Sequence, residues 1–167
     1  MSSIQQRIAE LGLELPQPPA PRGMYRPVAV HGSIAQVSGQ LSREGDRVIT
    51  GPVTAATSPA LIIRAGQACV LRALSALAHA LGDLDRVEEI LFVRGFVHAG
   101  PDFQDHSTVL DSASAVLLDI FGTAGAHARS AIGVASLPSG GLMEVELTVA
   151  VEHALGPELG LRSVDLP

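Results

Sequence analysis

Arg129 and Glu144 are the two residues whose types and positions best suit them to chemistry on a small molecule. Arg129 directly precedes the strongly apolar run at residues 130–135. An arginine at the mouth of a buried strand can offer a forked pair of N–H donors to a carboxylate. Glu144 lies in the polar half of the alternating strand that follows, and we expect the turn between the two strands to bring both residues toward one end of the same hairpin. Taken singly, each is also typical of a solvated or ion-paired surface position.

Other reactive residue types occur in settings that favour structural roles. Cys69 lies in an alanine-rich helical stretch, which is typical of a small core residue rather than of a nucleophile. Residues 98–106 gather histidines and aspartates, but both types are also common in loops and at helix N-termini, so we predict no metal site there. The sequence contains no phosphate-binding loop, serine-hydrolase elbow, zinc-protease helix or dinucleotide-binding turn.

The composition argues against several classes of function. The 167 residues carry a net charge of −6, the basic residues are scattered, and there are no Trp, one Tyr and four Phe. Nucleic acids are bound through clustered basic residues and aromatic platforms, so we predict no nucleic-acid partner. The apolar stretch at residues 73–81 is interrupted by Ser75 and His79, and we predict no membrane partner. A single cysteine and the lack of a secretory-type N-terminus favour a cytoplasmic protein.

Caps, periodicity and turns predict a leading helix followed by the order β-β-(β)-α-β-α-β-β. Ser3 caps the first short helix, Ser58 and Pro59 open a long one that ends at Gly82, and Gly122 ends another. The predicted strands are residues 28–30, 34–38, 48–49, 87–98, 130–136 and 142–152, and the second long helical stripe is residues 109–120. Because the strand at 87–98 is apolar on both alternating sets, we expect it to be buried on both faces.

This order predicts an α+β fold, with two helices on one face of a mixed sheet. The other sheet face would keep apolar residues, and the mean hydropathy of +0.33 is high for a monomer of this size, so self-association is expected. We divide the chain into a helix with a proline-rich arm at residues 1–24, a main domain at 25–154 and an irregular tail at 155–167.

Two segments near the C-terminus resemble a known family. Residues 128–138 (ARSAIGVASLP) and 143–146 (MEVE) are similar to the signature of the RidA/YjgF family of reactive-intermediate imine deaminases, also labelled L-PSP endoribonucleases. Upstream, Tyr25 and residues 37–41 (VSGQL) match its N-terminal strands at the right separation. The likeness covers about residues 25–151, and the leading helix and arm indicate a longer branch. It implies a chorismate-mutase-like α+β fold and a homotrimer with sites in the clefts between subunits.

The resemblance also implies roles for individual residues. Arg129 would pair with the substrate carboxylate, helped by the backbone N–H of Gly39. Glu144 would position the attacking water, and Tyr25 would line the cleft. A 2-imino acid has a carboxylate for the guanidinium and an electrophilic C=N carbon for the water. The implied function is hydrolytic deamination of 2-imino or enamino acids, without a cofactor, and the implied ligand is a small carboxylate metabolite.

The sequence departs from the family pattern at two places. Ala131 stands where the family has a cysteine, two residues after the arginine, so only its backbone carbonyl could hold water there. The second long helix offers Asp111, Ser112 and Ser114 in place of an aromatic residue and an asparagine. A non-catalytic trimer that binds a small carboxylate metabolite is therefore the alternative. Retention of Glu144 favours the enzyme, because binding alone needs only the arginine, and the acidic charge disfavours a ribonuclease.

Overall fold

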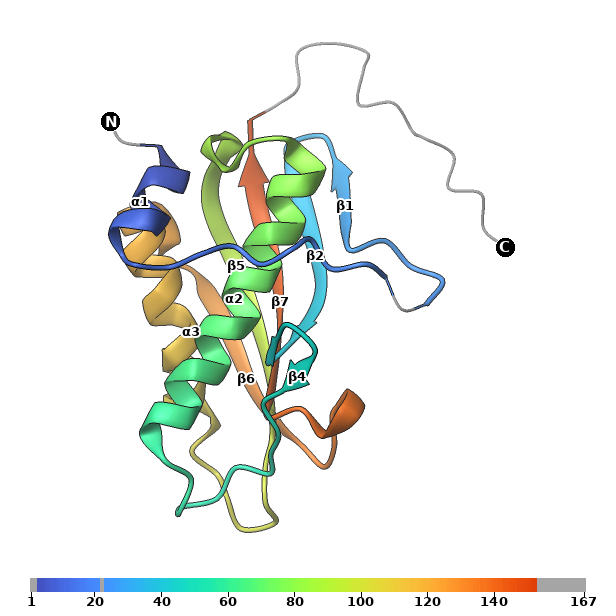
Figure 1. The fold of residues 1–167 in the computed structure, drawn as a ribbon, viewed down its shortest axis with the longest axis vertical. Coiled ribbons are helices and arrows are strands. Elements are labelled where there is room, and N and C mark those ends of the chain that lie inside the picture. Colours follow the sequence, from blue (N-terminus) through green and yellow to red (C-terminus); the bar gives the residue numbers. More distant parts are fainter. Residues whose placement is uncertain (1–2, 22, 153–167) are drawn as a thin grey trace.

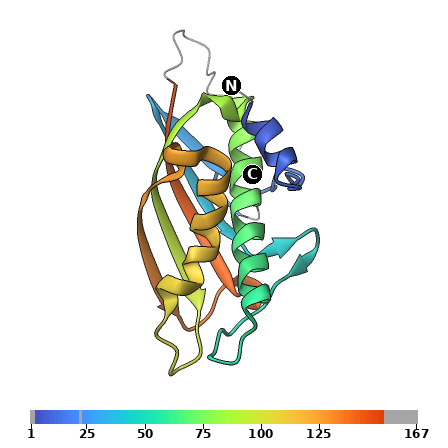
Figure 2. The ribbon, with the colours of Figure 1, turned by 90° about the vertical axis from the view of Figure 1, so that its left-hand side faces the viewer.

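A computed structural model describes residues 3–21 and 23–152, and the tail predicted at 155–167 lies outside this range. It contains a five-stranded sheet, two long helices against one face of it, and a short helix near the N-terminus (Figures 1 and 2). In chain order the helices and strands are α1 (Ile4–Glu10), β1 (Val28–His31), β2 (Ile34–Leu41), β3 (Arg43–Glu44), β4 (Arg47–Val48), α2 (Pro59–Leu81), β5 (Val87–His98), α3 (His106–Phe121), β6 (Ala128–Val134) and β7 (Met143–Val151). The predicted α+β class and element order are confirmed.

The strands of the large sheet are not arranged in chain order. Their spatial order is β1-β2-β7-β5-β6, while β3 and β4 form a separate two-stranded ribbon. β6 pairs in parallel with β5 through the crossover helix α3, and the other pairs are antiparallel. Consequently β5 separates β6 from β7, although these two strands are consecutive in the sequence.

The helix boundaries follow local signals that the sequence predicted. The hydroxyl of Ser3 accepts a hydrogen bond from the Gln6 N–H at 3.1 Å, and that of Ser58 accepts one from the Leu61 N–H at 3.3 Å. Gly82 ends α2 in the left-handed conformation, with φ of 83°. The two serine hydroxyls pair with backbone N–H groups at the helix N-termini that have no partner within the helix, and glycine is the residue that most readily adopts the left-handed conformation at a helix C-terminus.

The core lies between the sheet and the two long helices, as Figure 2 shows in side view. Side chains of β7 alternate along the strand, and Met143, Val145 and Leu147 are buried beneath the helices. The strand β5 is buried on this face alone, since Glu88 and Arg94 are exposed, so the prediction that it is buried on both faces is wrong for the single chain. Within residues 3–21 and 23–152, helices cover only one side of its sheet.

Two helical segments are long and apolar enough to cross a membrane by length and composition alone, α2 and residues 106–125. In the structure both pack on the sheet and supply residues to its core, and most of the α2 segment is buried there. Core helices of this kind pass the same test. The expectation of no membrane partner stays a prediction.

The N-terminal arm, residues 13–21, runs along the outer side of the helices and is held there by hydrogen bonds and packing. In α1, Ile8 joins the core and the Arg7 side chain donates to the Asp119 carbonyl at 3.0 Å. From there the chain crosses the outer side of α2 toward β1 (Figure 1), and the Ser75 hydroxyl donates to the Pro16 carbonyl at 2.6 Å. Prolines restrict the backbone of this arm, so its course is set by few contacts.

Cys69 is fully buried in α2, and its Sγ lies 3.4 Å from the carbonyl oxygen of Met143. Burial raises the pKa of this thiol strongly, and the negative charge of Glu144 raises it further. Because the thiolate is the reactive form, we interpret Cys69 as a core residue.

We therefore predict that native protein reacts with a thiol reagent such as DTNB only as fast as it unfolds. Cys69→Ala should lower the free energy of unfolding by about 1 kcal/mol, the ordinary effect of a small core truncation. Absorbance of the released thiolate measures the labelling rate, and urea denaturation measures the free energy of unfolding. Rapid labelling of the folded protein would show that Cys69 is accessible and that its assignment to the core is wrong.

Candidate functional site

A cavity of about 510 Å³ lies beside β2, and three of the predicted site residues line it: Tyr25, Gly39 and Glu144. Glu144 comes from the start of β7, which pairs with β2, and Tyr25 lies in the segment just before β1. The volume of the cavity falls in the range of roughly 300–1,000 Å³ that small-molecule sites have. The structure thus brings together residues that are more than a hundred positions apart in the sequence.

Gly39 makes room for the carboxylate of Glu144. The register between β2 and β7 shifts between Val37 and Gln40, so a bulge leaves Ser38 and Gly39 outside the regular ladder. A methyl group at position 39 would lie only 2.8 Å from Cδ of Glu144 and would overlap its carboxylate oxygen. The lack of a side chain at Gly39 is therefore what allows Glu144 to lie against the backbone of β2.

The electrostatic setting of Glu144 favours proton uptake. The residue is half-buried, and this burial raises the pKa of its carboxyl group, with the neighbouring charge of Glu146 raising it further. Glu146 is itself paired with Arg94 of β5, at 2.7 Å between Nη1 and Oε2. A carboxylate whose pKa is raised in this way accepts a proton more readily than one in water.

Several residues of the cavity were not found by sequence reasoning. Arg72 of α2 and Arg43 of β3 line it, and three residues of the N-terminal arm, Pro19, Ala20 and Pro21, also belong to the lining. For Arg72 a signal was present, because it is a charged residue within an otherwise apolar stretch of helix. For the arm no local pattern shows where its end will lie, because that depends on the path across α2.

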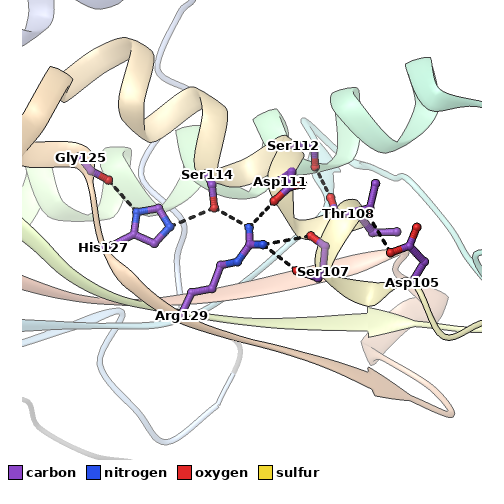
Figure 3. A network of polar contacts seen from close by, with 10 residues as sticks. Asp105, Ser107, Thr108, Asp111, Ser112, Ser114, Gly125, His127 and Arg129 are labelled. Atoms are coloured by element: carbon purple, nitrogen blue, oxygen red, sulfur yellow. Dashed lines mark hydrogen bonds and ion pairs between the residues drawn. The ribbon is translucent and has the colours of Figure 1, made fainter.

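Arg129 is held in a separate cluster of polar side chains between β6 and α3 (Figure 3). Its Nη1 donates to the Ser114 hydroxyl at 3.0 Å and lies 2.7 Å from Oδ1 of Asp111. Its Nη2 donates to the Ser107 hydroxyl at 2.8 Å. All three partners come from α3, so the guanidinium faces the helical side of the sheet.

His127 extends this cluster toward the end of α3. Its Nδ1 lies 2.6 Å from the Gly125 carbonyl oxygen, and its Nε2 lies 3.0 Å from the Ser114 hydroxyl (Figure 3). A carbonyl oxygen can only accept, so Nδ1 carries the proton in that contact. The chain of contacts from Gly125 through His127 and Ser114 fixes one side of the Arg129 guanidinium.

The expectation that Arg129 and Glu144 approach one end of a hairpin is wrong for the single chain. Their strands are not neighbours, because β5 lies between β6 and β7. Arg129 is in register with the buried Val93, whereas Glu144 is in register with Phe96, which belongs to the alternate set of β5. Side chains of paired residues share a face, so the two functional candidates lie on opposite faces of the sheet.

Ala131 lies on the same face as Arg129, two residues further along β6, and packs against the core. The predicted site residues thus form two groups: Tyr25, Gly39 and Glu144 around the cavity, and Arg129 with Ala131 beside α3. In the described part of the chain, residues 3–21 and 23–152, no group of three or more His, Cys, Asp or Glu side chains has a metal-binding arrangement.

Comparisons with known proteins agree on the family of folds. The model of a family described as "YjgF/chorismate mutase-like, putative endoribonuclease" matches residues 5–151. Protein TCP17 of Trypanosoma cruzi is 36% identical over 155 residues, which are 90% of this chain and 95% of that protein. The crystal structure of Atu1372 from Agrobacterium tumefaciens, a protein of unknown function, is 33% identical with a TM-score of 0.81, over 90% of this chain and 94% of that one. A crystal structure described as an endoribonuclease candidate from Shewanella oneidensis is 30% identical with a TM-score of 0.84, over 90% of this chain and all of that one.

The close fit of Glu144 against Gly39 predicts different effects for two glycine substitutions. Gly39→Ala should displace the flexible end of Glu144 and impair ligand binding, yet change the melting temperature by no more than a few degrees. Gly66→Ala is the matched control, because a methyl group there would lie 2.8 Å from the backbone nitrogen of Ala113 in α3 and should destabilise the fold by about 1–3 kcal/mol.

Thermal unfolding and calorimetric titration with 2-oxobutanoate, a 2-oxo acid, distinguish the two outcomes. If Gly39→Ala bound the acid as well as the wild type does, Glu144 would not need its position against β2. Equal destabilisation by both substitutions would show that Gly39 is instead a packing residue.

Proposed function

The chain belongs to the YjgF/chorismate-mutase-like family, and from this membership we propose that it hydrolyses 2-imino or enamino acids to 2-oxo acids and ammonia. The observation that carries the proposal is Glu144: a half-buried carboxyl group with a raised pKa at the wall of a small-molecule cavity. Gly39 and Tyr25 lie in the same wall, as the family resemblance implies for a substrate site.

The reaction needs one water and one proton acceptor. Glu144 takes a proton from the water as the oxygen of that water bonds to C2 of the imino acid, and the C=N electron pair moves to nitrogen. Glu144 then gives this proton to the nitrogen, which forms a carbinolamine. The C2 hydroxyl next gives its proton to Glu144, and that proton passes to the nitrogen as the C–N bond breaks, so that ammonia leaves and the 2-oxo acid forms. A positioned carboxylate can serve both the first and the last proton transfer, and such a group contributes about 10²–10⁴-fold in rate.

Arg129 can act on the same substrate only from a second copy of the chain, since it lies on the face of the sheet opposite Glu144. We therefore propose a site shared between copies in a homotrimer. The uncovered sheet face offers apolar surface for such an assembly in Phe92, Phe96 and Ile132, and Ile132 is 45% exposed. Arg94 and Glu146 form an ion pair on the same face.

In this assembly the substrate carboxylate competes with Asp111 for the guanidinium of Arg129. The side chain of Asp111 is 63% exposed, so it can move into solvent when a ligand carboxylate arrives. Ser114 and Ser107 keep the guanidinium in place during the exchange, because they hold it through hydroxyl groups that need not leave. Carboxylate binding by a fixed fork of donors is stronger than by a mobile one.

RNA cleavage is the second candidate, because the family description names an endoribonuclease. The net charge of −6 disfavours it, since binding of a phosphate backbone relies on clustered basic residues. The cytoplasmic location and the lack of a nucleic-acid partner stay predictions. A non-catalytic binder of small carboxylates would share the cavity but would not need the raised pKa of Glu144.

Replacement of Glu144 by glutamine should abolish turnover and spare binding. Glu144→Gln keeps the shape of the side chain but cannot accept the proton, so imine hydrolysis should fall about 10²–10⁴-fold while 2-oxo acid affinity changes little. The imine is generated in situ by an amino-acid oxidase and its survival is read by semicarbazide trapping. Glu88→Gln, an exposed carboxylate of β5, is the matched control. If the wild type binds the acid but does not accelerate hydrolysis, the chain is a binding protein.

The raised pKa of Glu144 predicts the direction of the pH dependence. Hydrolysis should rise as pH increases through this pKa, because only the deprotonated carboxylate accepts a proton from water. Glu146→Gln removes the neighbouring negative charge, which lowers the pKa of Glu144 and should move the acidic limb of the rate profile to lower pH. Glu88→Gln should leave the limb in place. An acidic limb unmoved by Glu146→Gln would mean that another group controls it.

A further inference from the structure

The cavity that contains Glu144 also contains two arginines that the proposed reaction does not use. Arg72 reaches it from α2 and Arg43 from β3, and both side chains are half-buried. The carboxylate anchor of the proposed reaction, Arg129, lies on the other face of the sheet. The cavity of a single chain thus contains two cationic side chains of its own, Arg43 and Arg72, in addition to the Arg129 that a second copy would supply.

The arginines are held in place by the surrounding protein. Arg64 of α2 donates from Nε to Oε1 of Glu44 at 2.7 Å, and this contact ties the β3–β4 ribbon to α2 next to Arg43. The Nη1 of Arg43 donates to the Asp46 carbonyl at 3.2 Å. Arg72 also interacts with other groups of the protein, and its Nε is buried, so its position does not depend on a ligand.

The charges in this cavity suit an anionic ligand group. Among residues 3–21 and 23–152, the charged residues that line it are Arg43, Arg72, Glu144 and Glu146, and Glu146 is already paired with Arg94. Arg72 and Glu144 both act on the buried Cys69, where Glu144 raises the thiol pKa and Arg72 lowers it, which agrees with their lying close together. An anion beside Glu144 would be repelled unless cations offset that charge, and the two arginines do so.

The end of the N-terminal arm lines the same cavity as the two arginines. Pro19, Ala20 and Pro21 bring no formal charge to it, and Ala20 and Pro21 are exposed. These three residues therefore add no carboxylate that would compete with a ligand anion for the guanidinium groups.

We propose that the cavity takes a 2-imino acid whose side chain ends in a second carboxylate, and that Arg72, assisted by Arg43, binds this distal group. This rests on the proposed deaminase function for the reacting end of the substrate. The α-carboxylate meets Arg129 of another copy, the C=N carbon lies at Glu144, and the distal carboxylate lies at Arg72. The favoured substrates are imines of acidic amino acids.

Two 2-oxo acids test this proposal by calorimetric titration of the full chain. 2-Oxobutanoate has one carboxylate and 2-oxopentanedioate has two. The wild type should bind the dicarboxylate more tightly, and Arg72→Gln should weaken dicarboxylate binding about 10–100-fold, the ordinary effect of losing a charged hydrogen bond. Monocarboxylate binding should change less than about 3-fold. Arg47→Gln, on the exposed strand β4 and outside the cavity lining, is the control and should bind both acids like the wild type.

Equal binding of the two acids by the wild type would overturn the proposal. So would an equal loss of both acids in Arg72→Gln, which would make Arg72 the anchor of the α-carboxylate. If Arg72→Gln does not fold, as judged by circular dichroism, Arg43→Gln is used instead. It should weaken binding of the dicarboxylate alone, by about 3–10-fold. The imine assay separates the two proposals. Turnover without a preference for the dicarboxylate would contradict only the role of Arg72 in binding the distal carboxylate. An Arg72-dependent preference without turnover would contradict only the deaminase activity.

Discussion

The packing of α2 and α3 against one face of the sheet is the contact on which the rest of this structure depends. It buries one alternating set of side chains in β5 and β7 and leaves the other set uncovered. Because paired strands keep the same alternation, it also decides on which face each functional side chain lies. Arg129 is turned toward α3 and Glu144 away from the helices. A sheet covered by helices on both faces would leave no such apolar surface for the proposed trimer.

The N-terminal arm gives the cavity a shape that the sheet alone would not provide. Its start is fixed by α1, its middle by the Ser75 contact to Pro16, and its end lines the cavity beside Tyr25. A segment outside the five-stranded sheet thus forms part of the wall of the cavity that contains Arg43 and Arg72.

Sequence reasoning predicted the features that depend on local chemistry and missed those that depend on strand order. Ser58, Pro59 and Gly82 set the ends of α2 through contacts within a few residues, so a single sequence suffices to place them. The separation of Arg129 from Glu144 depends on β5 entering between β6 and β7, and nothing near either residue signals this pairing. The fit of Glu144 against Gly39 needs a bulge between two strands, and only the family resemblance had linked these residues. Arg72 was visible as a charge in an apolar helix, but its cavity is formed by the arm and by β3.

We propose that Glu144 of one copy and Arg129 of another act on the same substrate. The test is to mix equal amounts of two inactive variants, Arg129→Lys and Glu144→Gln, under conditions that exchange subunits. A mixed trimer has some clefts with an intact Arg129 from one variant and an intact Glu144 from the other, so imine hydrolysis should return to about one quarter of the wild-type rate. Each variant alone should stay inactive, since lysine keeps the charge but loses the two-donor fork. If the mixture stays as inactive as its components although light scattering and mass spectrometry show mixed assemblies, the two residues do not share a site and the account is wrong.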